Sequence, residues 1–578
     1  MNDNECCLWV RRDLVCEIAR NGRVSRGWKP TRDDGRSKDS WPWIRAKVET
    51  SSGISPRNLS PRNKIRHEEE RNGPISIIIN DALDLDLHGL SITIPSDQRE
   101  SMVVTANSWW QKNEEPPEDL TTLNHLHEPA VILCLKERYK NDFIYTYTGK
   151  VLLAMNPFKA LGGLYGPDII QEFLPKDSDK QSPNKKSPHV YATAQDSYSS
   201  MMFYHQEGKI ASIEKNQSIL VSGESGAGKT VTTKIILGYL TAISTWQQKR
   251  PGSPRRINKV DSPSIESQVV QSNPILESFG NARTLRNDNS SRFGKFIDIS
   301  FDTLGRLYSA SIETYLLEKV RLIDQSEGER NYHVFYELLQ GLTLRERREF
   351  YLDGMKPQDF LMTSVSGTFN RRDGVDDEST YKDMVAALQT IGVCDQQRKA
   401  LFSVCCALLH LSNLRFFEIS SGGSELDQTN SSLDPALKLL GVPFETLNKA
   451  LCYSTIAAGG ETLLKNLSLI QARKALEAFM KAAYAALFQY VVKRINLSIS
   501  VEGLERNKHA HEKEYSSIGV LDIFGFESFD INSFEQLCIN FCNEALQQQF
   551  NSFVFKEEQR EYKQEGIEFS LIEFPDNQ

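Results

Sequence analysis

A glycine-rich stretch near the middle of the chain carries the residue types that hold a polyphosphate. Residues 223–230 match the pattern G-x-x-x-x-G-K-[ST] at every fixed position. Glycines let the backbone wrap around phosphate oxygens, Lys229 can neutralise β- and γ-oxygens, and the Thr230 hydroxyl can ligate Mg²⁺. The alternative is an ordinary glycine-rich turn, but residues 218–221 resemble a buried strand and 230–243 a helix. We therefore predict a nucleotide site, made by Gly223, Glu224, Ser225, Gly226, Ala227, Gly228, Lys229 and Thr230.

Two later polar stretches carry chemistry that belongs with such a site. Residues 287–295 contain clustered amides and hydroxyls, which suit a loop that closes over a γ-phosphate and completes a Mg²⁺ shell. Residues 522–527 follow the apolar strand 518–521. Asp522 at the strand end suits a metal-linked carboxylate, and Gly525 lets a backbone N–H approach the phosphate. Either stretch alone could be a polar turn, but the three in this order indicate one site.

The composition limits the class of protein. A length of 578 residues predicts a large body with several subdomains, or several domains. The net charge of −8 argues against a general nucleic-acid binder, which would show a basic surplus. No run approaches the roughly 20 apolar residues that span a bilayer, and the N-terminus has no apolar signal core. The ten cysteines include no C-x-x-C pair, so buried thiols such as Cys405 and Cys406 in a cytoplasmic, reducing compartment are expected.

The first 118 residues differ in texture from the rest. Short runs of aromatic and β-branched residues there are compatible with strands of a small barrel. These runs are residues 8–10, 41–44, 75–79 and 90–94. Residues 51–73 are rich in Ser, Pro, Arg and Asn, which predicts a mobile insertion. From about Asp119 the pattern is dense and continuous, so we place a main domain at 119–578.

Several elements of this main domain can be placed. Residues 150–155 indicate a buried strand that ends in a turn set by Pro157. Residues 175–188 and 247–264 lack periodicity and predict surface insertions; the second could affect nucleotide release or be an inert linker. Apolar residues at helical spacing follow residues 522–527, with Asn532 and Glu535 as the predicted cap.

The three motifs resemble the phosphate loop (residues 223–230), switch I (287–295) and switch II (522–527) of the myosin motor domain. Phe293-Gly294 and residues 524–526 exclude the kinesin pattern. Further similar stretches are 273–282, 328–336 and 532–540. The resemblance covers about 119–578 and implies an α/β fold. The architecture that it implies is a twisted central sheet of the P-loop NTPase type flanked by helices, with a helical actin-binding subdomain and, within 1–118, a divergent version of the small N-terminal β-barrel that many myosins carry.

The resemblance also implies Mg-ATP hydrolysis and assigns roles to residues. Ser290 lies beside the attacking water, Gly525 donates to the γ-phosphate, and Arg292 pairs with Glu527 when the switches close. The expected metal-site residues are Thr230, Ser291 and Asp522. The expected nucleotide contacts outside the phosphate loop are Asn156, Pro157, Tyr165, Asn287 and Asn289. Residues 161–165 depart from the family because they are one residue longer than its usual spacing.

The remaining family features concern partners. Residues 452–461 resemble an actin-contacting loop. By the same resemblance, Glu461 falls where the family needs an acidic or phosphorylatable residue and would supply a fixed negative charge; the alternative is a solvated surface glutamate. The helix that starts near Asn532 resembles the relay helix, after which the resemblance ends. Actin filaments are the expected partner, in the actin cytoskeleton as part of a myosin complex. Light chains and cargo would bind only through regions absent from this chain. Three functions stay open: an actin-based motor ATPase, a truncated non-motile nucleotide-binding or regulatory fragment, and a fragment without an independent role.

Overall fold

The structure is a computed structural model in which the chain divides into two compact units. One unit comprises Met1–Leu161 with Lys185–His189, and the other Gly162–Asn184 with Val190–Gln578. The model describes residues 7–11, 15, 43–48, 75–79, 90–94, 103–105, 115–175, 186–206, 216–250, 263–419, 422–458, 461–500, 515–528 and 532–568. The predicted insertion at 51–73 and most of the one at 175–188 lie outside these residues. The domain boundary expected near Asp119 stays a prediction.

The smaller unit contains an antiparallel sheet near the N-terminus. Its order is β4-β3-β2-β1-β5, and its strands are β1 (Cys7–Arg11), β2 (Trp43–Val48), β3 (Ile75–Ile79), β4 (Ser91–Ile94) and β5 (Val103–Thr105). All four predicted apolar runs contribute residues to these strands. Trp9, Val10 and Ile77 are buried in the sheet. Among the described residues the outer strands β4 and β5 do not pair with each other. Closure into a barrel therefore stays a prediction.

A helix and a hairpin complete the described part of this unit. They are α5 (Glu128–Lys140), β6 (Tyr145–Thr148) and β7 (Val151–Ala154). Strand β7 confirms the strand predicted at 150–155, but its predicted burial is wrong, because residues 151–153 are only half-buried and residues 154–155 are exposed. Buried Arg138 joins the helix to the hairpin, because its Nε donates to Thr146 Oγ1 at 2.9 Å and its Nη2 to Tyr145 O at 2.9 Å.

The larger unit is built on a central sheet of mixed direction. Its order is β12-β11-β17-β8, and the strands are β8 (Gln217–Val221), β11 (Gly294–Phe301), β12 (Leu307–Tyr315) and β17 (Ser516–Asp522). Strands β8 and β17 are parallel, with Asp522 opposite Val221. Strand β11 is antiparallel to β17, with Lys295 opposite Asp522. The phosphate loop, switch II and switch I therefore meet at one edge of the sheet.

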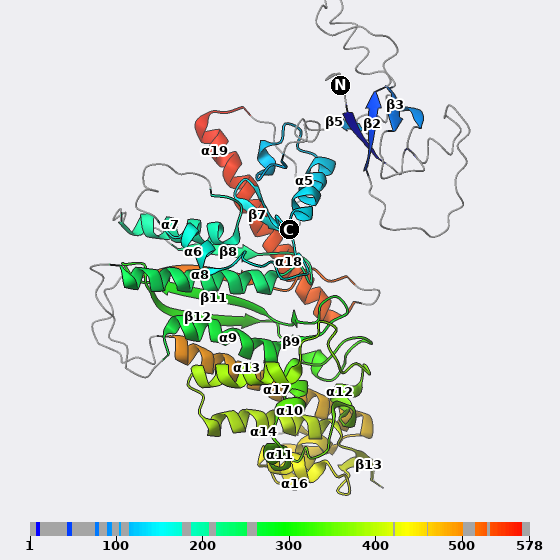
Figure 1. Cartoon of the computed structure of the whole chain (residues 1–578). Helices are drawn as coiled ribbons and strands as arrows, with labels where there is room; N and C mark the ends of the chain where they lie inside the picture. The colour runs from blue at the N-terminus through cyan, green and yellow to red at the C-terminus, as the bar shows by residue number, and fades with distance from the viewer. Residues whose placement is uncertain are drawn as a thin grey trace, which may run out of the picture. The chain divides into compact units, whose positions relative to one another are not determined.

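Helices cover both faces of this sheet, as the α/β prediction requires. Helices α7 (Val190–Gln206) and α8 (Lys229–Lys249) contact β8 and β17, whereas α9 (Ile265–Gly280) and α17 (Leu469–Ile499) contact β12. Figure 1 shows β11 and β12 between α8 and α9.

Strand β8 and helix α8 confirm the predicted strand–loop–helix arrangement. The predicted burial of the strand is wrong, because only Ile219 is buried in β8 and Leu220 is exposed. Helix α8 runs six residues beyond the predicted end at Ile243. The prediction of a loop from Gln247 is therefore wrong for the first residues. Gln247 Nε2 donates to Tyr198 OH at 3.2 Å and Gln248 Nε2 to Glu266 Oε1 at 2.9 Å, which stabilises the last turn. Residues 251–262 of the same predicted insertion lie outside the described residues.

A helical layer lies beyond α9. It includes α10 (His333–Gly341), α13 (Asp377–Thr390), α14 (Asp395–Ser412), α16 (Phe444–Cys452) and the hairpin of β15 (Tyr453–Ala458) with β16 (Glu461–Asn466). Cys405 and Cys406 are free thiols buried in α14, as predicted. The stretch expected to contact actin forms this hairpin, and Glu461 begins its second strand. No helix in the described part of the chain is long and apolar enough to cross a bilayer.

Helix α18 (Phe534–Asn551) confirms the predicted helix after switch II, but its predicted cap is wrong by one residue at each position. The cap is Ser533 with Gln536, not Asn532 with Glu535, because Ser533 N and Oγ both bond Gln536 Oε1, at 2.8 and 2.6 Å. Three apolar residues of the helical pattern, Phe534, Leu537 and Phe541, are exposed rather than buried.

Candidate functional site

The phosphate loop joins the end of β8 to the start of α8. Gly228, the cap of α8, has φ of +92°, a left-handed conformation that glycine adopts without steric cost. Lys229 folds over the loop, where its Nζ donates to Gly223 O and Glu224 O at 2.7 Å each. Burial lowers the pKa of the Lys229 ammonium, against the attraction of Asp522 and other carboxylates. A partly desolvated cation at a helix N-terminus is an anion-binding arrangement.

Two hydroxyls and a carboxylate nearby fit a magnesium ion. The Thr230 Oγ1 and Ser291 Oγ atoms are 3.1 Å apart. Adjacent oxygen ligands of an octahedral Mg²⁺, each at about 2.1 Å from the metal, are roughly 3 Å apart. Asp522 is buried, and its Oδ2 accepts no hydrogen bond from the described residues, while Lys295 Nζ lies 3.4 Å from it. This orphaned oxygen can accept from water bound to the metal, so the residues present fit Mg²⁺.

Gly525 packs directly against the phosphate loop. A Cβ atom built on Gly525 would lie 2.4 Å from Gly223 O and 2.8 Å from Glu224 Cα. Any side chain would therefore displace the loop backbone, and the predicted need for glycine is explained by this close approach. Its donation to a γ-phosphate stays a prediction.

A buried ion pair joins switch I to switch II. Arg292 Nη1 donates to Glu527 Oε1 at 2.9 Å and Nη2 to Oε2 at 3.4 Å. The two side chains are only 3% and 4% exposed. Arg292 Nη1 also donates to Ser290 Oγ at 3.2 Å. Three of the four predicted catalytic residues are thus in direct contact.

Glu318 is a member of this junction that the sequence prediction missed. Its Oε2 accepts from Arg292 Nε at 2.7 Å and from Arg321 Nε at 2.6 Å. Burial alone would raise the pKa of Glu318, but the two arginines outweigh it and lower the pKa to about 2. Burial likewise opposes the charge on Arg292, but Glu318 and Glu527 raise its pKa above the usual range. Glu318 and Arg292 are therefore both charged in the folded protein near neutral pH.

Asn540 connects switch II to helix α18, a role that was also missed. Glu527 N donates to Asn540 Oδ1 at 2.9 Å, and Asn540 Nδ2 donates to Glu527 O at 2.7 Å. Two reciprocal bonds fix the backbone of switch II to the helix, so a displacement of one moves the other. Asn540 ends the similar stretch 532–540, which was its only signal in the sequence.

The two predicted asparagines of switch I have different surroundings. Asn287 lies beside the phosphate loop, since a Cβ on Gly226 would be 3.9 Å from Asn287 Cβ. The Asn289 side chain is engaged within the protein: its Oδ1 accepts from Asn281 Nδ2 at 3.0 Å and lies 3.2 Å from His333 Nε2. Contacts of either residue with nucleotide stay predictions.

The predicted purine contacts fall in different units. Asn156 and Pro157 belong to the smaller unit, where Asn156 Oδ1 accepts from Phe158 N at 2.9 Å. Tyr165 belongs to the larger unit, where its ring meets Tyr191 edge-on with centroids 6.2 Å apart. Their purine contacts stay predictions.

Comparisons with known proteins agree with the motifs. The family model described as "Myosin head (motor domain)" matches residues 117–578. Myosin-2B of Naumovozyma castellii is 40% identical over 464 residues, which are 80% of this chain and 31% of the relative. Unconventional myosin-Vb of Mus musculus is 42% identical over 462 residues, 80% and 23% of the two chains. Myosin-5 of Arabidopsis thaliana is 40% identical over 499 residues, 85% and 30%. The chain thus spans 23–31% of the length of these relatives.

Proposed function

The chain belongs to the myosin head (motor domain) family, and on this premise we propose that it is an actin-based motor ATPase. It binds Mg-ATP, hydrolyses it, and couples the hydrolysis to binding of actin filaments in the cytoplasmic actin cytoskeleton. The central sheet and the phosphate loop are those of a P-loop NTPase. The comparisons do not favour the alternative of a non-motile fragment.

The phosphate loop and switch I would hold the nucleotide. Lys229 would neutralise the β- and γ-phosphates, Thr230 and Ser291 would ligate Mg²⁺, and Asp522 would accept from a water bound to the metal. The bound metal supplies charge stabilisation to the phosphate oxygens. The support for this assignment is the 3.1 Å separation of the two hydroxyls beside an orphaned carboxylate oxygen.

The buried Arg292–Glu527 pair is the observation that carries the hydrolytic function. It joins switch I to switch II beside the phosphate loop, with both side chains shielded from water. Arg292 also positions the Ser290 hydroxyl, at 3.2 Å. Phosphoryl transfer needs orientation and charge stabilisation more than a strong base. We propose that the pair excludes bulk water and holds Ser290 where it orients the attacking water.

Coupling to actin would use two parts of the larger unit. Switch II is bonded to α18 through Asn540, so closure of the switches displaces this helix. The β15–β16 hairpin, which begins at Tyr453, would contact the filament and present Glu461. The N-terminal sheet would be the small barrel found in many myosins.

A double-mutant cycle on the pair tests the hydrolytic proposal. We expect Arg292→Gln and Glu527→Gln each to slow single-turnover hydrolysis by about 100-fold, the loss that misplacement of reacting groups causes. The double variant should be no slower than the slower single variant, because both remove the same interaction. Neutral replacements are preferable to reversed charges, because a glutamate at position 292 would face Glu318, which now accepts from Arg292 Nε at 2.7 Å.

Nucleotide binding supplies the matched control. Both variants should bind a fluorescent ATP analogue within a few-fold of the unmodified chain, whereas Lys229→Ala should lose a charge-assisted contact worth about 1.5–3 kcal/mol. Normal turnover in either single variant would contradict the closure mechanism. Undiminished binding by Lys229→Ala would contradict the nucleotide site itself.

A further inference from the structure

The turn at residues 284–288 overlaps the start of switch I and lies against the phosphate loop. A Cβ atom on Gly226 would be 3.5 Å from Arg286 O and 3.9 Å from Asn287 Cβ. The turn is closed by its own bonds, from Thr284 N to Asn287 O at 2.8 Å and from Asn287 N to Thr284 Oγ1 at 3.2 Å. Whatever fixes this turn therefore fixes one wall around the phosphate loop.

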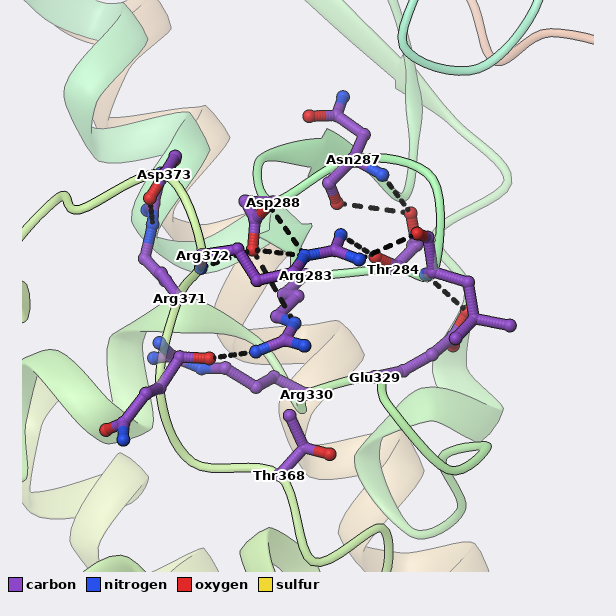
Figure 2. A network of polar contacts seen from close by, with 12 residues as sticks. Arg283, Thr284, Asn287, Asp288, Glu329, Arg330, Thr368, Arg371, Arg372 and Asp373 are labelled. Carbon is purple, nitrogen blue, oxygen red and sulfur yellow. Dashed lines mark hydrogen bonds and ion pairs between the residues drawn. The ribbon is translucent and has the colours of Figure 1, made fainter.

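One arginine from a distant loop spans the whole turn, as Figure 2 shows. Arg372 Nη2 donates to Thr284 O and Nη1 to Leu285 O, both at 2.9 Å. Its Nε lies 3.1 Å from Asp288 Oδ2, and its backbone N donates to Asp288 Oδ1 at 2.9 Å. Four contacts thus run from a single residue to both ends of the turn. Only a planar, multi-donor guanidinium can make the three side-chain contacts at once.

The loop that carries Arg372, residues 366–376, is itself anchored to the protein. Ser366 Oγ donates to Glu329 O at 2.6 Å, and Arg283 Nη1 donates to Asn370 O. The neighbouring Arg371 points away from the turn and pairs with Asp373 in its own loop, at 2.5 and 3.0 Å (Figure 2). Of the two adjacent arginines, one shapes the loop and the other reaches the turn.

We propose that Arg372 is a positioning residue for nucleotide, which clamps the 284–288 turn and thereby slows nucleotide release. Replacing the Arg372 side chain would loosen the turn that lies against the phosphate loop. The Arg372 side chain makes no contact with a group assigned to phosphate or metal. The effect on release rests on the proposed function, whereas the clamp itself does not. A plain surface brace would instead change overall stability and leave the turn and the release rate unaltered.

Hydrogen exchange on the full chain without nucleotide tests the clamp. In Arg372→Ala we expect amide exchange in residues 284–288 to be about tenfold faster, equivalent to roughly 1.4 kcal/mol. Arg372→Lys should recover little, because a single ammonium group cannot span the turn. The matched control is Arg348→Ala, which removes an exposed ion pair with Asp353 elsewhere in the same unit and should leave the turn unchanged. Unchanged protection of the turn in Arg372→Ala would overturn the proposal.

Release of a fluorescent ADP analogue, followed by stopped flow, tests the consequence. We expect release to be about tenfold faster in Arg372→Ala, with the melting temperature within the range of Arg348→Ala. If the unmodified chain binds the analogue and Arg372→Ala releases it at the same rate as the unmodified chain, the proposed effect of Arg372 on release is wrong. The proposed nucleotide site would then still be supported. If the unmodified chain does not bind the analogue, the proposed function and the effect on release both fail, and the exchange experiment still decides the clamp.

Discussion

Two glutamates in the larger unit are both largely buried and have opposite environments. Glu318, in the junction around Arg292, is 12% exposed at its side chain and accepts from two arginines, which lower its pKa to about 2. Glu337, in helix α10, is 2% exposed, and within the part of the chain that the structure describes its Oε2 has no hydrogen-bond partner. Burial raises the pKa of Glu337 to about 7, with a smaller contribution from Asp377.

The difference lies in the partners rather than in the residue type or the depth of burial. Two guanidinium groups keep Glu318 ionised, and the ionised network attracts switch I toward switch II. Glu337 has Arg330 near it, but that arginine is already paired with Asp377 at 3.0 Å. The surroundings of Glu337 therefore favour a neutral carboxyl, whereas those of Glu318 favour the charged form.

The largest effect on stability should come from removing the shared arginine. Arg292→Ala leaves Glu318 with one partner and Glu527 with none, in surroundings that exclude water. We expect a loss of about 3–5 kcal/mol in the free energy of unfolding, typical of breaking a buried pair from one side. Urea unfolding measures it, with Arg348→Ala as the exposed comparison, for which a loss below about 1 kcal/mol is expected. Equal losses in Arg292→Ala and Arg348→Ala would show that the buried ion pairs of Arg292 stabilise the fold no more than an exposed ion pair does.

The chemistry of the site could be predicted because its signals are local in the sequence. The phosphate loop is recognisable from eight consecutive residues between strand and helix patterns, and the structure has β8 and α8 around it. The cap of α18 was misplaced because Asn532 and Ser533 both have side chains that suit an N-cap, and local preference alone does not separate them.

The missed residues act through contacts that are distant along the chain. Glu318 is 26 positions from Arg292, and Arg372 is 88 positions from Thr284. Nothing near either residue in the sequence distinguishes it from a solvated surface charge. The extra turn of α8 was missed for a related reason, since Gln247 is stabilised by a tertiary bond to Tyr198. Tertiary partners, not local propensity, decided these cases.

The opposite environments of the two glutamates predict opposite dependences on pH. Glu337 has a folded pKa of about 7, above the unfolded value. Its contribution to stability is therefore fully present below about pH 4.3 and is lost as pH rises through 7. Glu318, with a folded pKa of about 2, contributes above about pH 4.3 and loses that contribution as pH falls toward 2. Of these two glutamates, only Glu337 should titrate in the folded protein between pH 5 and 8.

The free energy of unfolding of Glu337→Gln, relative to that of the unmodified chain, should therefore increase between pH 5 and pH 8. We expect this increase to be about 1–3 kcal/mol. Urea unfolding at the two pH values measures this. Glu318→Gln is the matched control, and its difference from the unmodified chain should not change between the same pH values. A Glu337→Gln difference that is independent of pH would show that Glu337 is ionised throughout, and the contrast between the two regions would be lost.

The smallest expected effect is the response to salt of two ion pairs that involve switch I, Arg372–Asp288 and Arg292–Glu527, because their side chains differ in exposure. The Arg372 and Asp288 side chains are 46% and 13% exposed, compared with 3% and 4% for Arg292 and Glu527. Salt screens exposed charges, since the Debye length falls from about 10 Å at 0.1 M to about 3 Å at 1 M, but it screens buried pairs much less. Raising the salt concentration across this range should therefore speed amide exchange in residues 284–288 by about two- to threefold, or roughly 0.4–0.7 kcal/mol, which lies within the range typical of exposed pairs. The effect should stay below that of Arg372→Ala, because the bonds from Arg372 to Thr284 O and Leu285 O involve neutral acceptors and survive screening.

Exchange of Glu527 N, which is bonded to Asn540, should not respond to salt. An equal response at both places would mean that burial does not distinguish the two contacts.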